Sequence, residues 1–174
     1  MKLDLNTVIL ETARLRLVPL TQKYAEDCFR EFTAEVTTWM WPAPPKSITD
    51  SENYIMETTS KRVAGHEIVF AVITKDDEFL GCAGIHEVDT HTPEFGIWLK
   101  VSAQNQGYGK EVIMALKEWT DAHIDYTYIK YPVAVENLRS RALAESLGGE
   151  VAGEFERPTQ EGRLMREVEY HIFK

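Results

Sequence analysis

Two closely spaced glycines stand at the start of a helix-forming segment, directly after an apolar strand-forming run. The run is Glu94 to Val101, and the glycines are Gly107 and Gly109. A helix N-terminus leaves backbone N–H groups unpaired and carries a partial positive charge. Glycine has no Cβ, so a phosphate can approach such a backbone closely. The stretch therefore predicts an anion-binding loop in which main-chain groups do the binding.

Two common phosphate-binding motifs do not fit this loop. A P-loop needs a hydroxyl residue after its lysine, and here Glu111 follows Lys110. A dinucleotide-binding fingerprint needs GxGxxG in an early βαβ unit, which the chain lacks. What remains is Gln104-x-x-Gly107-x-Gly109 at the head of an amphipathic helix. This pattern resembles the acyl-CoA motif of GNAT acetyltransferases, usually written Arg/Gln-x-x-Gly-x-Gly/Ala.

Two further segments carry the same resemblance. Residues 133–149, with Asn137 and Ser140 in the family's spacing, are similar to the strand and helix that follow the CoA-binding helix. Gly149 replaces an aromatic residue of that pattern, a departure expected to affect packing more than chemistry. Residues 11–17 resemble the first strand of the ribosomal-protein alanine N-acetyltransferase branch. The resemblance implies an α/β GNAT fold, with a mixed central sheet flanked by helices and a splayed strand at the CoA site.

The resemblance also implies acetyl-CoA as cosubstrate, with no metal. Strand main chain is expected to contact the pantetheine arm, and the glycine loop to hold the pyrophosphate. Asn137 and Ser140 are expected near the pantetheine or the acceptor end. The strand contacts would come from Ile97, Trp98 and Leu99, and the pyrophosphate site from Gln104, Asn105, Gln106, Gly107, Tyr108, Gly109 and Lys110.

An acidic protein needs local cations to bind a polyanion such as CoA. Four basic residues close to the motifs are candidates: Lys100, Lys110, Arg139 and Arg141. A solvated helix face explains either arginine equally well.

Acetyl transfer to an amine needs a proton acceptor and a group that stabilises the leaving thiolate. Glu94 shares a strand face with Gly96 and Trp98 and is the first candidate base, directly or through water. A surface glutamate at a strand edge is the alternative. Ser140 holds the position that is often Ser or Tyr in the family, and hydrogen bonding to the thiolate is its expected role. An ordinary helix serine is the alternative there.

Four residues are expected to contact the acceptor. In GNAT proteins the loop between the first two helices lines the acceptor pocket, which points to Trp39 and Trp41. A core-filling loop explains these tryptophans about as well. His86 and Glu87 end the strand before Glu94 and would lie beside it, which makes them second candidates for the base.

Hydrophobic periodicity places these residues on elements. Three consecutive runs joined by polar connectors predict an antiparallel meander. Leu138, Ala142, Leu143 and Leu147 are expected to form the buried stripe of the last helix. The expected strands are 13–20, 66–74, 79–88, 94–101, 126–135, 151–157 and 164–173, and the expected helices are 24–32, 48–63, 107–123 and 137–147, in one domain spanning 1–174.

Composition narrows the class of protein. The net charge of −9 disfavours direct nucleic-acid binding and suits a cationic amine, although solubility alone explains it as well. Apolar runs stay below the ~18 residues of a membrane span, so no membrane association is expected. The N-terminus lacks a basic start followed by an apolar block, so no secretory signal is expected. Cys28 and Cys82 indicate reduced core residues of a cytoplasmic protein rather than a disulfide framework or zinc site.

The acceptor amine follows only in part from these patterns. Deprotonating an α-amine at pH 7 costs about 1 kcal/mol, against about 4–5 kcal/mol for a lysine. Together with the branch resemblance, this favours a protein or peptide N-terminus. A polyamine, an aminoglycoside or an amino acid remains an alternative acceptor, and a catalytically silent CoA-binding sensor is an alternative function. The sequence leaves the oligomeric state open, a homodimer included.

Overall fold

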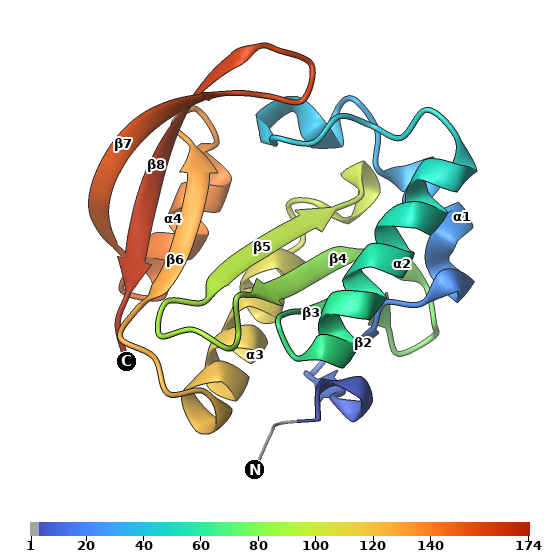
Figure 1. Ribbon diagram of the computed structural model, residues 1–174, viewed down its shortest axis with the longest axis horizontal. Helices are drawn as coiled ribbons and strands as arrows, with labels where there is room; N and C mark the ends of the chain where they lie inside the picture. Colours follow the sequence, from blue (N-terminus) through green and yellow to red (C-terminus); the bar gives the residue numbers. More distant parts are fainter. Residues whose placement is uncertain (1–3) are drawn as a thin grey trace.

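A mixed sheet of eight strands runs through the protein, and the structure, a computed structural model, describes residues 4–174 (Figure 1). Residues 1–3, part of the segment considered above for a secretory signal, lie outside the described residues. The strand order is β1-β2-β3-β4-β5-β6-β8-β7, and among these strands the β5–β6 pair alone is parallel. The strands are β1 (Leu10–Glu11), β2 (Leu15–Pro19), β3 (Ile68–Thr74), β4 (Phe79–His86), β5 (Glu94–Leu99), β6 (Ile129–Ala134), β7 (Glu150–Pro158) and β8 (Leu164–Ile172).

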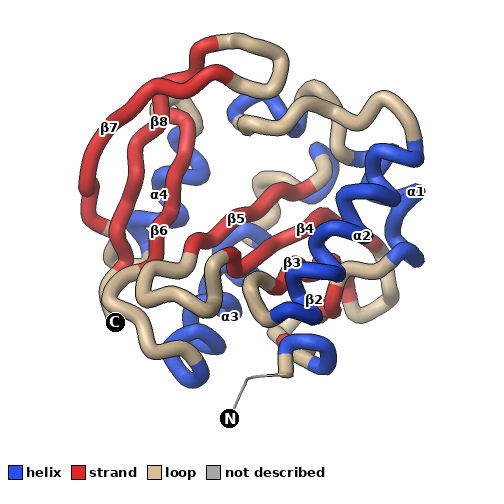
Figure 2. The backbone as a smooth tube through the Cα atoms, in the orientation of Figure 1, coloured by secondary structure: helices blue, strands red, loops and turns tan. Residues whose placement is uncertain are grey.

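Helices cover both faces of this sheet (Figure 2). The α-helices are α1 (Ala25–Glu31), α2 (Ile48–Ala64), α3 (Tyr108–His123) and α4 (Leu138–Ser146), and the short 3-10 turns are η1 (Leu5–Thr7), η2 (Gln22–Tyr24), η3 (Val36–Trp39) and η4 (Val101–Ala103). Helices α1 and α2 pack through Cys28 and Ile55 onto one face of β3 and β4. Helix α3 packs through Val112 and Leu116 onto the opposite face, which also carries α4. Along the described chain, no helix combines the length and apolar character that crossing a membrane requires.

The expected order of elements and the antiparallel meander of β3, β4 and β5 are confirmed. The element ends differ from the expected ones by a few residues at most. Helix α2 begins with the expected capping box, in which the Asp50 carboxylate accepts a hydrogen bond of 2.9 Å from the Ser47 N–H. Strand β1 was not expected, because two residues are too few to show an alternating pattern.

The predicted buried stripe of α4 is partly wrong. Leu138 is 69% exposed and Ala142 is also exposed, whereas Leu143, Ala144 and Leu147 face the core. The helix is oriented by Ser140, whose Oγ lies 2.9 Å from the hydroxyl of Tyr131 in β6. Residues three, four and seven positions after Ser140 therefore share its inward face.

The two cysteines, far apart in the sequence, meet in the core between α1 and β4. Both are buried free thiols, as expected of core-filling residues, with their sulfur atoms 3.9 Å apart. Burial raises the pKa of the Cys82 thiol, so the neutral form is favoured.

Gly81 sets how closely β4 can approach β5. A Cβ added at this glycine would lie 2.1 Å from the carbonyl oxygen of Trp98, a backbone atom that cannot move without breaking the β4–β5 pairing. The absence of a side chain at Gly81 is therefore a requirement of the strand that carries the motif.

We expect Gly81→Ala to lower the free energy of unfolding by about 3 kcal/mol, because overpacking against a fixed backbone forces the strands apart. Gly153→Ala in β7 is the matched control, since a Cβ there meets no atom within 4 Å. Its effect should stay within about 0.5 kcal/mol. Urea unfolding of the three proteins measures both changes, and equal stabilities for the two variants would contradict the prediction.

Candidate active site

Strand β5 leaves its parallel neighbour β6 almost as soon as the two meet. β5 pairs with β4 along its whole length, but with β6 only at Glu94 and Lys130. One hydrogen bond of 2.8 Å, from the Lys130 N–H to the Pro93 carbonyl, closes that end. Beyond it the strands diverge, as Figure 1 shows. The splayed strand expected at this place is confirmed.

The backbone of β5 presents donors to this gap. The Lys100 N–H donates to the Leu80 carbonyl at 2.7 Å, and the Trp98 carbonyl approaches Gly81. The even-numbered residues of β5 therefore direct their N–H and carbonyl groups toward β4. Because direction alternates along a strand, Ile97 and Leu99 direct theirs toward the gap. Trp98, the third residue expected to offer main-chain contacts, instead packs its side chain on Phe32, with ring centroids 4.8 Å apart.

The glycine loop after β5 adopts the conformation that its sequence requires. Gly107, at the N-cap of α3, has φ +80°, and Asn105 has φ +62°. The side chain of Gln104 donates to the Leu99 carbonyl at 3.0 Å, which fixes the loop to the strand. The first helical N–H groups, those of Tyr108, Gly109 and Lys110, have no intrahelical partner. The loop is thus a set of free donors open to an anion.

Three basic side chains lie at this loop, one of which sequence reasoning missed. Arg14 donates to the Gln106 carbonyl at 3.0 Å, and its guanidinium stacks 4.3 Å from the Tyr108 ring centroid. The Arg14 Nε donates to Oε2 of Glu111 at 2.7 Å. Partial burial raises the pKa of Glu111, but hydrogen bonds from Thr12 and Arg14 outweigh it and lower that pKa overall. Arg14 lies 92 residues from its partner Gln106, so no local pattern pointed to it.

The four cations expected from the sequence divide into two groups. Arg139 donates to the Gln104 side chain at 3.3 Å, and Lys110 is exposed on the first turn of α3. Lys100 is instead paired with Glu78 at 2.7 Å, and Arg141 donates to the Tyr170 hydroxyl at 3.0 Å. Free donors, a loop without a Cβ at its turn, and nearby cations together fit a diphosphate.

Glu94, His86 and Gly96 share the face of the sheet that α1 and α2 partly cover. His86 is opposite Glu94, and Gly84 is opposite Gly96. The imidazole of His86 lies across the two glycines, with Nε2 at 3.0 Å and 3.3 Å from the positions that their Cβ atoms would take. Its Nδ1 is 2.9 Å from Glu67, a residue that the sequence analysis did not single out.

The Glu94 side chain is partly buried, with 35% of its surface exposed, where the two strands part. This burial raises the pKa of Glu94, although Lys130, at 3.9 Å, and His86 act in the opposite direction. Glu87, in the left-handed conformation with φ +54°, holds Lys130 at 2.5 Å. A carboxylate with a raised pKa can take up a proton closer to neutral pH.

Ser140 and Asn137 lie at the start of α4, as expected. The Asn137 side chain accepts a hydrogen bond of 3.2 Å from the Ser140 N–H and caps the helix. The Ser140 hydroxyl is 2.9 Å from the hydroxyl of Tyr131, which burial shifts to a pKa of about 12. The sequence analysis missed Tyr131, whose hydroxyl reaches the serine from a strand buried in the core.

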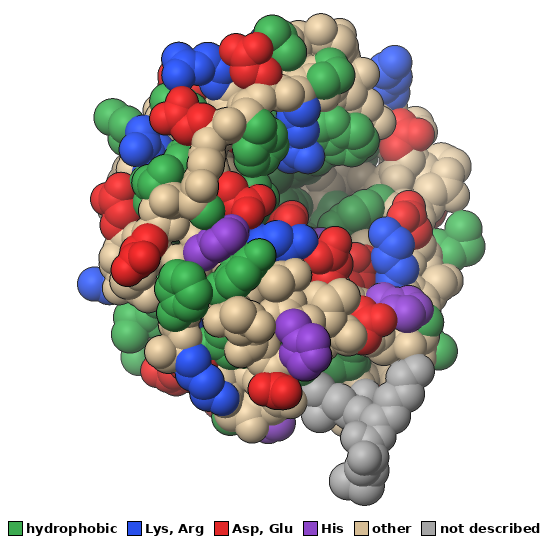
Figure 3. Space-filling model, turned by 60° about the vertical axis from the view of Figure 1, so that its left-hand side comes forward, with side chains coloured by type: hydrophobic (Ala, Val, Ile, Leu, Met, Phe, Trp, Pro, Cys, Tyr) green, Lys and Arg blue, Asp and Glu red, His purple; other side chains and the backbone are tan. Residues whose placement is uncertain are grey.

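The tryptophan loop forms an arch with the hairpin of β7 and β8. Trp39 and Trp41 are both partly exposed. The Trp41 carbonyl accepts from the Gln160 N–H at 3.0 Å, and the Ala43 N–H donates to the Gln160 side chain at 2.9 Å. Arg163 adds a bond of 2.7 Å to the Thr38 carbonyl. Figure 3 shows a hollowed face with acidic and basic side chains at its rim.

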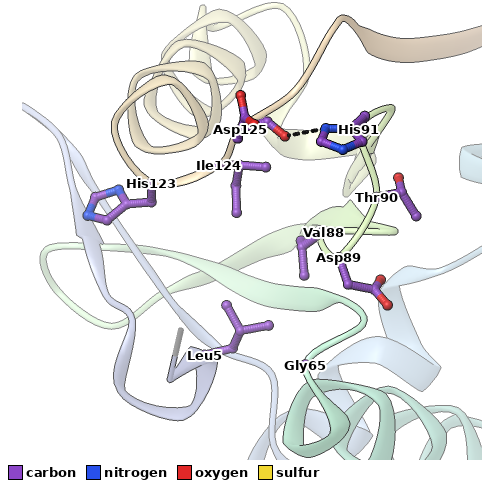
Figure 4. A pocket seen from close by; sticks show the side chains of 9 residues that line it. All are labelled: Leu5, Gly65, Val88, Asp89, Thr90, His91, His123, Ile124 and Asp125. Carbon is purple, nitrogen blue, oxygen red and sulfur yellow. Dashed lines mark hydrogen bonds between the residues drawn. The ribbon is translucent and has the colours of Figure 1, made fainter. Parts of the chain in front are cut away.

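A separate pocket lies at the far end of α3 from the glycine loop. It is lined by residues after β4 and after α3, among them Val88, His91, Ile124 and Asp125 (Figure 4). The imidazole of His91 contacts the Asp125 carbonyl at 3.2 Å. None of the residues predicted for the active site lines this pocket.

Comparison with known proteins identifies the family. A sequence model described as "Acetyltransferase (GNAT) domain" matches residues 14–150, which hold the glycine loop, Glu94 and Ser140. The chain belongs to the GNAT acetyltransferase family. It is an acetyl-CoA-dependent N-acetyltransferase, with the α/β fold expected of that family. The search of curated proteins found no match.

Solved structures of other acetyltransferases share this fold. RimL, a ribosomal L7/L12 alpha-N-protein acetyltransferase solved with coenzyme A, is 16% identical with a TM-score of 0.84, covering 95% of this chain and 98% of RimL. The microcin C7 self-immunity acetyltransferase MccE, solved with acetyl-CoA and AMP, is 19% identical with a TM-score of 0.82 and 94% coverage of both chains. A GCN5-related N-acetyltransferase from Brucella melitensis is 21% identical with a TM-score of 0.80, covering 95% of this chain and 78% of that one.

We expect Gly107→Glu in this GNAT acetyltransferase to raise the Kd for acetyl-CoA about 100-fold, a loss of about 2.7 kcal/mol. The added carboxylate would occupy the loop and repel the diphosphate. Gly148→Glu is the matched control, because Gly148 also has a positive φ of 75° and its Cβ would meet no atom within 4 Å. Both variants bear similar backbone strain. Isothermal calorimetry that returned the same Kd for both would overturn the role of the loop.

Proposed function

We propose that this enzyme transfers the acetyl group of acetyl-CoA directly to the α-amine of a protein or peptide N-terminus. The observation that carries the proposal is the composition of the sheet face beyond the β5–β6 gap. Glu94 and Glu169 are partly exposed on that face where α1 and α2 no longer cover it. An ammonium group is the complementary partner for such a surface.

The sheet pairings define this acidic face. Glu94 is in register with Lys130 in β6, and the same face continues into β8 as Glu167 and Glu169, because these pair with the neighbours of Lys130 at two-residue intervals. Arg157 neutralises Glu167, with an N–O distance of 2.8 Å. Since Lys130 is also held by Glu87, the face keeps excess negative charge for a cationic acceptor.

The proposed catalytic roles involve the main chain of β5, Glu94 and Ser140. Acetyl-CoA, when bound, supplies an activated thioester. The N–H groups of Ile97 and Leu99 would donate to its carbonyl oxygen and stabilise developing negative charge. Glu94 would bind the acceptor ammonium and accept its proton, directly or through water. The Ser140 hydroxyl, backed by Tyr131, would donate a hydrogen bond to the thiolate as the C–S bond breaks.

The remaining expected site residues would hold the two substrates. Gln104 to Lys110 would bind the diphosphate through main-chain N–H groups, with Arg14, Lys110 and Arg139 as counter-charges. Asn137 would fix the Ser140 segment beside the pantetheine arm. Trp39, Trp41, His86 and Glu87 would border the acceptor.

Three points favour an α-amine over a lysine or a small amine. The arch between the tryptophan loop and the hairpin leaves a bounded opening, which suits a chain terminus that enters end-on. An α-amine costs about 3 kcal/mol less to deprotonate than a lysine. RimL, whose fold matches closely, acts on a protein α-amine.

The acceptor is tested by CoA release with a panel of amines. Peptides with free N-termini should give a kcat/KM at least ~100-fold above an N-terminally blocked peptide with a lysine, from the ~2.5-unit difference in ordinary pKa. Mass spectrometry locates the acetyl group. Faster turnover of spermidine, an aminoglycoside or a free amino acid would refute the N-terminal acceptor, and acetyl-CoA binding without turnover of any amine would leave the sensor alternative.

We expect Glu94→Gln to lower kcat/KM about 100-fold and not to destabilise the protein at neutral pH. Burial raises the pKa of Glu94, so the charged form weakens the folded state above that raised pKa, whereas below the unfolded-state value the carboxyl is protonated in both states. Glutamine lacks this penalty. The melting temperature of the variant minus that of wild type should therefore be larger at pH 8 than at pH 4. Glu118→Gln, on the exposed face of α3, should change neither property.

A further inference from the structure

The buried carboxylate of Glu67 bonds to His86, which lies on the same face of the sheet as Glu94. Glu67, directly before β3, is only 6% exposed. Its Oε2 is 2.9 Å from the His86 Nδ1 and 3.9 Å from the Lys61 Nζ. Its Oε1 is enclosed and makes no hydrogen bond with any described residue. A buried carboxylate is costly unless it is fully paired, so the arrangement sacrifices stability to hold His86.

The bond to Glu67 fixes which nitrogen of His86 is free. A carboxylate only accepts hydrogen bonds, so Nδ1 carries the hydrogen and Nε2 bears a lone pair in the neutral ring. Nε2 lies over Gly84 and Gly96, close to where their side chains would be. The two glycines therefore make room for the ring, and the free nitrogen rests on the strand that borders the gap.

This nitrogen is next to the groups proposed to handle the reacting atoms. Gly96 directly precedes Ile97, whose N–H faces the gap, and Glu94 is the register partner of His86. The side chain of His86 remains one-third exposed, so a substrate or water can reach it. The charged or titratable groups around the ring are Glu67, Lys61, His66, Glu87, Asp89, Glu94 and Lys130.

The reaction needs two proton acceptors. An ammonium has three hydrogens on nitrogen and the product amide has one, so two protons leave the acceptor nitrogen. The first must leave before attack, because the ammonium has no lone pair. The second leaves as the C–N bond forms and the nitrogen becomes acidic. One proton finally ends on the thiol of CoA, and the other is released to water.

We infer that His86 Nε2 accepts the second of these protons, with Glu67 as the residue that positions it, while Glu94 accepts the first. This assignment rests on the proposed function. Two acceptors on adjacent strands, in register and on one face, match the two protons that the chemistry releases. His86 then passes its proton to water, which restores the neutral ring.

The test compares variants of the full chain with acetyl-CoA and the amine that wild type acetylates fastest. His86→Gln should lower kcat about 100-fold, with less than about threefold change in KM for the amine and in Kd for acetyl-CoA. His66→Gln is the matched control. His66 lines the same pocket as His86, and its Nδ1 lies 2.7 Å from a carboxylate oxygen of Asp89. A His86→Gln enzyme with more than half of the wild-type kcat, or one changed only in KM, would overturn the assignment.

A shift from pH 7 to pH 9 separates the two proton acceptors. An α-amine is largely neutral at pH 9, so the deficit of Glu94→Gln should shrink about tenfold there. The deficit of His86→Gln should stay, because the second proton must still leave. If both deficits shrink together, the two residues serve the same proton and the assignment fails.

Glu67 is tested through its effect on His86. Glu67→Gln should add no loss of kcat to His86→Gln, because a residue that acts through another loses its effect when that one is removed. Nitrogen-15 NMR of wild type should show hydrogen on Nδ1, and Glu67→Gln should mix the two tautomers. Unchanged tautomers, or additive losses, would refute the positioning role. If Glu67→Gln does not fold, Glu67→Asp should restore partial activity and the His86 variants still decide.

The experiments distinguish a wrong acceptor from a wrong assignment of His86. If wild type acetylates small amines and not peptides, the N-terminal acceptor is wrong, yet the His86 comparison proceeds with that small amine. The wild-type tautomer measurement needs no turnover, and hydrogen on Nε2 would refute the inference on its own.

Discussion

The divergence of β5 from β6 is the constraint on which the site depends. Hydrogen bonding between the two strands stops after one residue pair, so the peptide groups of Ile97 and Leu99 have no strand partner. Unpaired backbone groups in a sheet interior are unfavourable unless something else bonds them. The β4–β5 contact at Gly81 and the fixing of the loop by Gln104 hold the strand in this position. The sheet thereby keeps open a gap that full pairing would close, and this gap is the place proposed above for the thioester.

The gap also separates two kinds of chemistry. On the side of α3, main-chain donors and the cations Arg14 and Arg139 suit an anion. On the side of α1 and α2, Glu94 and Glu169 suit a cation. The sheet lies between them, so in the proposed reaction the anionic carrier and the cationic acceptor would approach from opposite directions. The net charge of −9 does not predict this division, because it sums both faces.

Local patterns predicted much of the fold and several local features of the candidate site. The glycine loop, the capping box of α2 and the Asn137 cap could be read from the sequence because they are determined by residues within a few positions of one another. Arg14 and Glu67 could not, because their partners lie 92 and 19 residues away and become neighbours only when the strands from β2 to β5 pair and α3 packs on them. The stripe of α4 was partly misassigned for a related reason. Helical spacing leaves the orientation of the helix undetermined, and the Tyr131 hydroxyl at Ser140 decides it.

Three hydrogen bonds close the arch between the tryptophan loop and the hairpin of β7 and β8. Hydrogen bonds of this kind contribute about 1 kcal/mol each, so the three between the tryptophan loop and the hairpin tip are a weak closure compared with the pairing of the sheet. Separation breaks none of the β-sheet pairings, since Gln160 and Arg163 lie in the turn between the last two strands. Parting of this span opens the side of the arch, so the product of the proposed acetylation of a chain end would have a sideways exit.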